Sequence, residues 1–354
     1  MKPLLLSVDY ELFFGEDSGT VENCMIRPLK HLMEVLDAFE GKMTVFWDIL
    51  HFYRLQQLAP EVDDLRFDME LIEKQIHTLL KKGHDVQMHL HPHWLDARWD
   101  KQKWRFSYNR FSLHRLWDDA DPENMDSIMG VVTRARLLLE EVCRKVDPAY
   151  RVRVFRAGAY RVEPFGRLAA ALQANGLRVD SSAGKGMRSF SDAYPFDFSR
   201  LPDFTHYRFD DTVMLHHSEG LFWEFPKGMV KVPPLRRIQF YFLQNFVYPW
   251  RGTYGDGKRL AFTRKEQSGH WWTLPGSRYY RLTAEGMDPV RWRYLWQQTS
   301  PWSQIVLHSK SMSPRTVELL RQNLRHRELA FHSLRQRLDD LKVYPGEDGP
   351  MKVE

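Results

Sequence analysis

Short apolar strands recur along this chain, and most of them end at an ionisable side chain. Residues 4–8 form an almost continuous apolar run that leads into Asp9 and Glu11, and residues 43–47 form a second run. Runs of this kind are typical of strands buried on both faces of a parallel sheet. Further strands are predicted at residues 86–88, 152–155, 177–179, 221–225 and 305–307. Because helical patterns separate most of these strands, the sequence predicts an α/β fold.

The helical patterns also outline the domain organisation. In residues 25–39 the apolar side chains recur every three or four positions, which is the spacing of one helix face. The same spacing predicts helices at residues 69–80, 125–142 and 164–172, and a long C-terminal helix at about 314–341. A long loop is expected at 94–119. The chain is predicted to be a single domain over residues 1–354, with an aromatic-rich insertion at about 232–300.

Charge and cysteine content narrow the class of protein. The 354 residues carry 51 Lys and Arg against 46 Asp and Glu, a net charge of +5, which permits an anionic partner but is typical of a mixed-charge surface. Cys24 and Cys143 are too few for a disulfide scaffold. The apolar start is too short for a signal peptide, and no stretch approaches the ~20 apolar residues of a membrane span. We therefore expect a cytoplasmic protein with at most peripheral membrane contact.

Four of the 15 histidines lie within ten residues of one another, at His84, His89, His91 and His93. Imidazole is the commonest protein ligand for zinc and similar metals. Three histidines at alternate positions behind a strand favour a metal site over a solvated turn. A metal ion needs further ligands, and distant parts of the chain must supply them.

Parallel strands bring their carboxyl ends to one rim of a sheet or barrel, where such folds place their active sites. The side chains expected at that rim are Asp9, Glu11, His89, His93, Arg156, Asp180 and His308. Two histidines and one carboxylate leave open positions on a divalent metal, which can then bind water and lower the pKa of that water. The sequence thus predicts one pocket assembled from separate segments.

Five short motifs occur in order at these strand ends: Val8-Asp9-Tyr10-Glu11, His89 to His93, Arg156 to Tyr160, Asp180-Ser181-Ser182 and Leu307-His308. They resemble the motifs of the polysaccharide deacetylase family, the NodB-homology group of carbohydrate esterases. Within that family the chain most resembles the WbmS-like deacetylases of O-antigen clusters. The resemblance implies a distorted (β/α) barrel, usually of seven strands. It also implies a divalent metal, with zinc as the first candidate, and the removal of acetyl groups from sugars.

The metal ligands implied by the resemblance are His89, His93 and one carboxylate. The family usually has two adjacent aspartates in its first motif, whereas Tyr10 separates Asp9 from Glu11 here. Residues two apart on a strand share a face, so either carboxylate can be the ligand and the other the base. His91 is additional to the family pattern, and we interpret it as a neutral histidine with a structural hydrogen bond.

The remaining roles follow from the same resemblance. Arg156 would keep the basic carboxylate ionised while that carboxylate deprotonates the attacking water. The backbone N–H of Tyr160 would stabilise the oxyanion. His308, oriented by Asp180, would protonate the departing amine, because an amine is a poor leaving group until it is protonated.

The expected substrate is an acylated saccharide, linked to a nucleotide or a lipid, in the biosynthesis of a surface polysaccharide such as O-antigen. Aromatic residues make up 14% of the chain, and exposed rings suit stacking on sugars. The alternative is a catalytically inactive deacetylase-like protein that binds a glycan or an assembly partner. A nucleic-acid binder, suggested by Arg and Trp in residues 236–296, has no recognisable motif to support it, so we expect no nucleic-acid partner.

Overall fold

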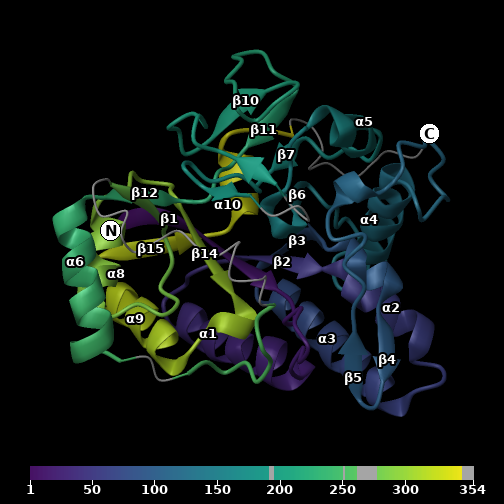
Figure 1. Cartoon of the computed structure of the whole chain (residues 1–354), viewed down its shortest axis with the longest axis horizontal. Coiled ribbons are helices and arrows are strands. Elements are labelled where there is room, and N and C mark those ends of the chain that lie inside the picture. Colours follow the sequence, from purple (N-terminus) through teal and green to yellow (C-terminus); the bar gives the residue numbers. More distant parts are fainter. Residues whose placement is uncertain (191–194, 250–251, 261–276, 345–354) are drawn as a thin grey trace.

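A curled, mostly parallel β-sheet forms the centre of the protein (Figure 1). The computed structural model describes residues 1–190, 195–249, 252–260 and 277–344. Within them, one nine-stranded sheet has the order β10-β11-β7-β6-β3-β2-β1-β14, and β15 also pairs with β1. The strands are β1 (Lys2–Tyr10), β2 (Thr44–Asp48), β3 (Asp85–Leu90), β6 (Val154–Ala157), β7 (Val179–Asp180), β10 (Tyr207–Phe209), β11 (Phe222–Glu224), β14 (Gln304–His308) and β15 (Leu329–His332). The β10–β11 pair is antiparallel and the other pairs are parallel.

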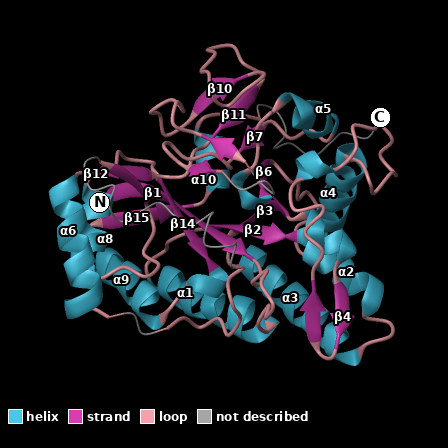
Figure 2. Cartoon of the chain, in the orientation of Figure 1, coloured by secondary structure: helices cyan, strands magenta, loops and turns pink. Residues whose placement is uncertain are grey.

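Helices cover the outer side of this sheet. Figure 2 shows α1, α3 and α9 in a row along the sheet, with α2 and α4 next to α3. The helices are α1 (Arg27–Ala38), α2 (Ile49–Leu58), α3 (Asp63–Lys81), α4 (Ile128–Arg144), α5 (Gly166–Ala174), α6 (Pro234–Phe242), α8 (Pro289–Gln297), α9 (Pro314–Arg325) and α10 (Leu334–Asp340). In α1 the buried side chains include Leu29, Leu32 and Leu36, which is the stripe predicted from their spacing. Helix packing therefore follows the local apolar pattern.

The sheet curls until its two ends approach each other through Lys227. The backbone N–H of Lys227 donates to the carbonyl of Ala183 beyond β7 (2.8 Å), and the next N–H donates to the carbonyl of Gln304 in β14 (2.9 Å). Both contacts belong to isolated parallel bridges. The predicted α/β fold, a distorted (β/α) barrel, is confirmed. The sheet has nine strands rather than seven, because β10 adds an antiparallel strand at one end and β15 pairs with the first residues of β1, on the edge of β1 that faces β2.

Smaller elements connect the strands of the main sheet. They are the pairs β4 (Arg98–Asp100) with β5 (Lys103–Arg105), β8 (Arg188–Ser189) with β9 (Phe196–Asp197), and β12 (Met229–Val232) with β13 (Arg278–Arg281). The β4–β5 hairpin lies within the loop expected at 94–119. The insertion expected at about 232–300 contains α6, β13 and α8, and residues 250–251 and 261–276 of it lie outside the described part. In the described residues, no helix is both long enough and apolar enough to span a bilayer.

The prediction of a single long helix at about 314–341 is wrong. Helix α9 ends at Arg325, the strand β15 follows, and α10 begins at Leu334. Arg327 has a positive φ of 52°, which breaks the helix and turns the chain toward β1. Leu329 and Phe331 are then buried at alternate positions, and pairing with β1 outweighs the helical pattern of the surrounding sequence.

Candidate functional site

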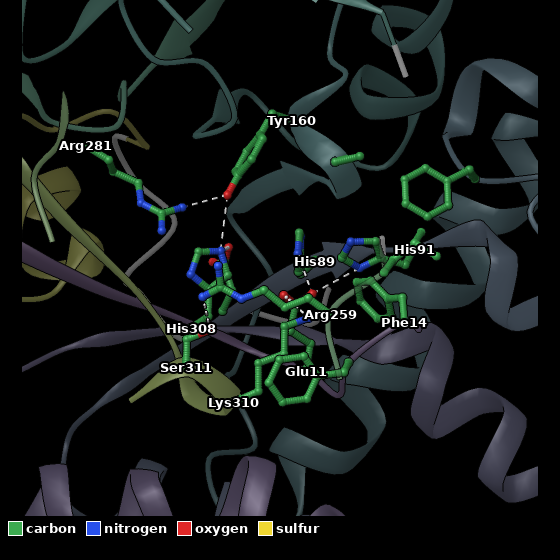
Figure 3. A pocket seen from close by; sticks show the side chains of 15 residues that line it. Glu11, Phe14, His89, His91, Tyr160, Arg259, Arg281, His308, Lys310 and Ser311 are labelled. Carbon is green, nitrogen blue, oxygen red and sulfur yellow. Dashed lines mark hydrogen bonds and ion pairs between the residues drawn. The ribbon is translucent and has the colours of Figure 1, made fainter. Parts of the chain in front are cut away.

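The parallel strands bring several of the predicted side chains to one rim. In the pairing register Asp9 of β1 lies beside His308 of β14, and His89 of β3 lies beside Arg156 of β6. A cavity of about 390 Å³ opens at this rim (Figure 3). Its lining consists of Asp9, Glu11, Phe13, Phe14, His89, His91, Phe111, Ala159, Tyr160, Arg259, Leu260, Arg281, His308, Lys310 and Ser311. Separate segments therefore build a single pocket.

Glu11, His89 and His91 form a buried group with metal-ligand spacing. Glu11 Oε2 lies 3.5 Å from His89 Nε2 and 3.4 Å from His91 Nδ1, and one ligand atom from each residue lies within 4.8 Å of the others. His89 and His91 share a face because they stand two apart on backbone that stays extended through His91. Two imidazoles and a carboxylate are a donor set typical of zinc and related divalent metals.

The hydrogen bonds around this group leave its inner atoms free for a cation. The Nδ1–H of His89 donates to the backbone carbonyl of Arg156 (2.9 Å), so the lone pair of Nε2 faces Glu11. Lys310 Nζ contacts the outer carboxylate oxygen of Glu11 at 2.9 Å. In the described part of the chain, Glu11 Oε2 and His91 Nδ1 are buried without a hydrogen-bond partner. Because such atoms are costly to leave unsatisfied, the residues present fit a bound divalent metal.

Neighbouring cationic groups keep Glu11 ionised. Burial acts to raise the pKa of this carboxyl group, but the Lys310 ammonium and the neighbouring histidines outweigh burial and hold the pKa well below its usual range. Glu11 is therefore ionised, which is the form that binds metal.

Gly158 allows His91 to occupy this position. A Cβ atom on Gly158 would lie 2.3 Å from the Leu90 carbonyl oxygen and 2.6 Å from Cδ2 of the His91 ring. Both distances are shorter than real Cβ contacts, so only glycine lets the end of β6 approach so closely. The glycine of the Arg156 to Tyr160 motif thus helps to shape the metal group.

His93, predicted as a ligand, lies outside this group. Pro92 begins a 3-10 helix, Pro92–Asp96, which ends the alternation of the strand. The ring of His93 packs among aromatic rings, with centroids 4.6 Å from Phe14, 5.2 Å from Phe106 and 5.4 Å from Phe111. Burial lowers the pKa of His93 well below its usual value, so the ring is neutral. The structure places His91, and not His93, beside Glu11 and His89.

Asp48, which sequence reasoning missed, lies beside the same ring nitrogen of His91 that faces Glu11. It is fully buried at the end of β2 and faces His89 in the neighbouring strand. Its Oδ2 accepts a hydrogen bond from the indole N–H of Trp94 (2.6 Å) and lies 3.3 Å from His91 Nδ1. The sequence did carry a signal for this residue, because Asp48 directly follows the predicted strand at 43–47, like the other strand-end residues.

The second carboxylate, Asp9, pairs with the buried guanidinium of Arg156. Arg156 Nη1 donates to Asp9 Oδ1, and its other N–H groups donate to the backbone carbonyl of Ser181 (2.9 Å) and to the Ser7 and Ser181 hydroxyls. Burial acts to raise the pKa of Asp9, but the charge of Arg156 outweighs burial and holds the pKa below its usual range. The two carboxylates therefore have different partners: Glu11 lies beside the histidines and Asp9 beside the arginine.

His308 is held by contacts on both ring nitrogens. Its Nδ1 lies 3.2 Å from Glu285 Oε1, and its Nε2 lies 3.5 Å from Asp9 Oδ2 and 3.2 Å from the Tyr160 hydroxyl. Arg281 donates to the Tyr160 hydroxyl (2.8 Å) and to Glu285 Oε2 (3.2 Å), and Figure 3 shows Arg281, Tyr160 and His308 around one side of the pocket. Glu285 and Arg281 lie in the stretch at 232–300 that the sequence pattern could not resolve.

Tyr160 reaches the pocket through an unusual backbone turn. Ala159 and Tyr160 both have positive φ angles, 52° and 62°, a conformation that non-glycine residues adopt rarely. The turn directs the Tyr160 ring over the rim, where its hydroxyl contacts His308. The role expected for the Tyr160 backbone N–H stays a prediction.

Asp180 does not orient His308. Its carboxylate accepts hydrogen bonds from the backbone N–H (3.0 Å) and hydroxyl (2.5 Å) of Ser182, and it lies beside Glu224 and Lys227 at the ends of neighbouring segments. Burial and the charge of Asp180 raise the pKa of Glu224 well above its usual value. Glu285 occupies the position beside His308 that was expected for Asp180.

Comparison with known proteins gives weak likenesses to solved structures. No family model and no curated protein matches the sequence. A protein from Mycobacterium smegmatis, named provisionally as a polysaccharide deacetylase, is 13% identical with a TM-score of 0.46, covering 96% of this chain and 90% of the other. Puue allantoinase is 10% identical with a TM-score of 0.44, covering 97% and 91%.

A family 4 acetyl xylan esterase from Clostridium thermocellum, solved with a cobalt ion, is 12% identical with a TM-score of 0.35, covering 97% and 93%. Two of these solved structures thus carry the names of a polysaccharide deacetylase and an acetyl xylan esterase. Identities and TM-scores are all low, so the function proposed below depends on the geometry of the pocket.

Proposed function

We propose that this protein is a metal-dependent hydrolase that removes an N-acyl group, N-acetyl first among the candidates, from a saccharide. It would act on a carbon–nitrogen bond other than a peptide bond. One observation carries this proposal. The group formed by Glu11, His89 and His91 lies at the same cavity as His308 and the ionised carboxylate of Asp9.

Glu11, His89 and His91 would hold the metal, with zinc as the first candidate. A divalent metal bound there supplies Lewis acidity, which lowers the pKa of a bound water and polarises the acyl oxygen. The contact of His89 Nδ1 with the Arg156 carbonyl leaves Nε2 directed at Glu11, and Glu11 carries the charge that ligation requires.

Two different residues of the chain carry out the two proton transfers. Asp9 accepts the proton of the attacking water, and Arg156 keeps Asp9 ionised. His308 donates a proton to the departing amine, and Glu285 holds its ring by accepting from Nδ1–H. The backbone N–H of Tyr160 is the proposed donor to the oxyanion.

The pocket lining favours an acylated sugar that carries an anionic group. Phe13, Phe14 and Phe111 supply aromatic surface on which a sugar ring can stack. Arg259 and Lys310 line the same cavity as cations (Figure 3). We propose a nucleotide-linked or lipid-linked saccharide of surface polysaccharide biosynthesis, such as O-antigen.

Metal analysis combined with acetate release tests the proposal. Protein purified without chelator should contain one equivalent of a divalent metal and release acetate from N-acetylated sugars. His91→Ala should lose both the metal and the activity. His93→Phe, which keeps an aromatic ring among the aromatic neighbours of His93, should keep both.

Metal loss in His93→Phe with full retention in His91→Ala would contradict the assigned ligands. Absence of metal together with unchanged glycan binding would instead support a catalytically inactive, glycan-binding protein.

A further inference from the structure

Helix α6 and the π-helical turn Leu243–Val247 that continues it carry large apolar side chains into solvent. Leu235 is 82% exposed, Ile238 54%, Phe242 56% and Phe246 67%. These residues are spaced three or four positions apart, so they lie along one face of the helix. We call these four residues the outer stripe. An exposed apolar patch of this kind marks an interaction surface.

The opposite face of the same helix attaches it to the protein. Phe240 is buried, with its ring 5.7 Å from Tyr280 and 5.6 Å from Tyr294. At 100° per residue, Phe240 points away from Leu235, Ile238 and Phe242. The helix is thus fixed by its inner side, and the outer stripe is left without cover in the described part of the chain.

The chain segment that contains the outer stripe carries only positive charges. No Asp or Glu occurs between Glu224 and Asp256, whereas five Lys and Arg residues do. Two of these cations, Lys231 and Arg236, are exposed. Arg236 lies over the ring of Tyr294 at 5.3 Å and so stands at the flank of the helix, beside the protein. An exposed apolar stripe in a segment whose charges are all positive is the pattern of a helix that lies in a membrane interface.

We propose that the outer stripe docks on an anionic phospholipid surface, with α6 lying in the plane of the interface. Its apolar side chains would enter the boundary of headgroups and acyl chains, while Lys231 and Arg236 meet the lipid phosphates. A second copy of this chain fits less well. A twofold contact through the stripe would bring the same cations of both copies together, and residues 225–255 supply no acidic partner for them.

Docking there would hold one wall of the pocket close to the membrane. Strand β12 leads directly into α6, and its partner β13 carries Arg281, which contacts Tyr160 in the pocket. Figure 1 shows α6 at the edge of the molecule, close to β12. The bilayer would therefore contact the element that supplies one side of the candidate site.

Vesicle co-sedimentation tests this inference with the full chain. Wild type should bind vesicles of phosphatidylcholine with phosphatidylglycerol, and bind less to phosphatidylcholine alone or in high salt. The double variant Ile238→Ser with Phe246→Ser should bind the anionic vesicles at least tenfold more weakly. Phe190→Ser with Leu215→Ser, which removes two comparably exposed apolar residues elsewhere (83% and 67% exposed), should bind like wild type.

Equal losses in the two double variants, or no binding of wild type to anionic vesicles, would overturn the inference. So would a concentration-dependent dimer that the Ile238→Ser and Phe246→Ser changes dissociate. Hydrolysis of a soluble acylated sugar should be unchanged in both double variants, because none of the four residues lines the pocket. Loss of vesicle binding is thereby separated from failure of the proposed function.

Discussion

Asp9 and Glu11 stand two residues apart on the same strand end, yet they have different partners. Glu11 faces two histidines and Lys310, whereas Asp9 faces Arg156 and His308. Both are ionised for the same physical reason: a buried cation next to each outweighs the cost of burial. One carboxylate can therefore bind a metal while the other accepts protons.

Replacement of Asp9 by Asn should separate these two functions. We expect Asp9→Asn to keep its metal but to lose activity by roughly 10²- to 10⁴-fold, the usual contribution of a general base. Metal content and the rate of acetate release measure the two effects. Because Arg156 would lose its carboxylate partner, a melting curve should accompany them. Loss of metal in this variant would indicate that Asp9 is a ligand.

Glu285 and Asp180 offer a matched comparison for the orientation of His308. Glu285→Gln removes the charge beside His308 Nδ1, and we expect kcat to fall by roughly 10- to 100-fold with the metal retained. Asp180→Asn should leave kcat unchanged. A fall in kcat in Asp180→Asn alone would restore the role first expected for Asp180.

The residue that follows β6, Gly158, packs closely against the end of β3. Gly158→Ala would force its new methyl group against the Leu90 carbonyl and the His91 ring. We expect metal affinity to fall roughly 10- to 100-fold, as it does when support for a ligand is disturbed. Gly166→Ala is the control, because a Cβ there meets nothing within 4 Å. Metal titration of both variants is the measurement, and equal affinities would rule out this steric role.

Helix α3 carries a carboxyl group that makes stability depend on pH. Burial, with the charges of Asp64 and Glu22, raises the pKa of Asp68 to about 7. In the unfolded chain this pKa is about 3.9, so the folded state holds a proton that the unfolded state releases. The favourable contribution of Asp68 is present below about pH 4 and is lost as the pH rises to about 7.

Asp68→Asn should remove this dependence. Urea unfolding should show the variant to be more stable than wild type at pH 8, and the difference should shrink toward pH 4. A difference of the same size at both pH values would show that the charge of Asp68 is not its cause.

At the scale of the whole molecule, the metal group joins segments that are far apart in sequence. Glu11 follows β1, and His89 and His91 belong to β3 and its extension. A ligand that binds only the folded state stabilises it by mass action. We expect a chelator to lower the melting temperature of wild type, on the order of 5 °C if the metal was present at a thousandfold excess over its Kd. His91→Ala should show no such shift, and an equal shift in both proteins would argue against the site.

The sequence alone determined the α/β class, most of the parallel strands, and the presence of ionisable side chains at the ends of those strands. These features depend on local periodicity, which the backbone of each element imposes on its own residues. The alternation that places His89 and His91 on one face is also a signal for His91, but the family resemblance leads us to predict His93 as the ligand instead.

The tertiary structure decided the partners. Pairing with β1 makes part of the expected C-terminal helix a strand, β15. His93 packs in an aromatic cluster instead of facing Glu11. Glu285, which lies beside His308, comes from a stretch in which the sequence showed no helical or strand pattern. Which carboxylate meets which cation depends on contacts between residues up to about three hundred positions apart, such as Glu11 with Lys310. Local sequence does not encode such contacts, because packing of the whole sheet sets them.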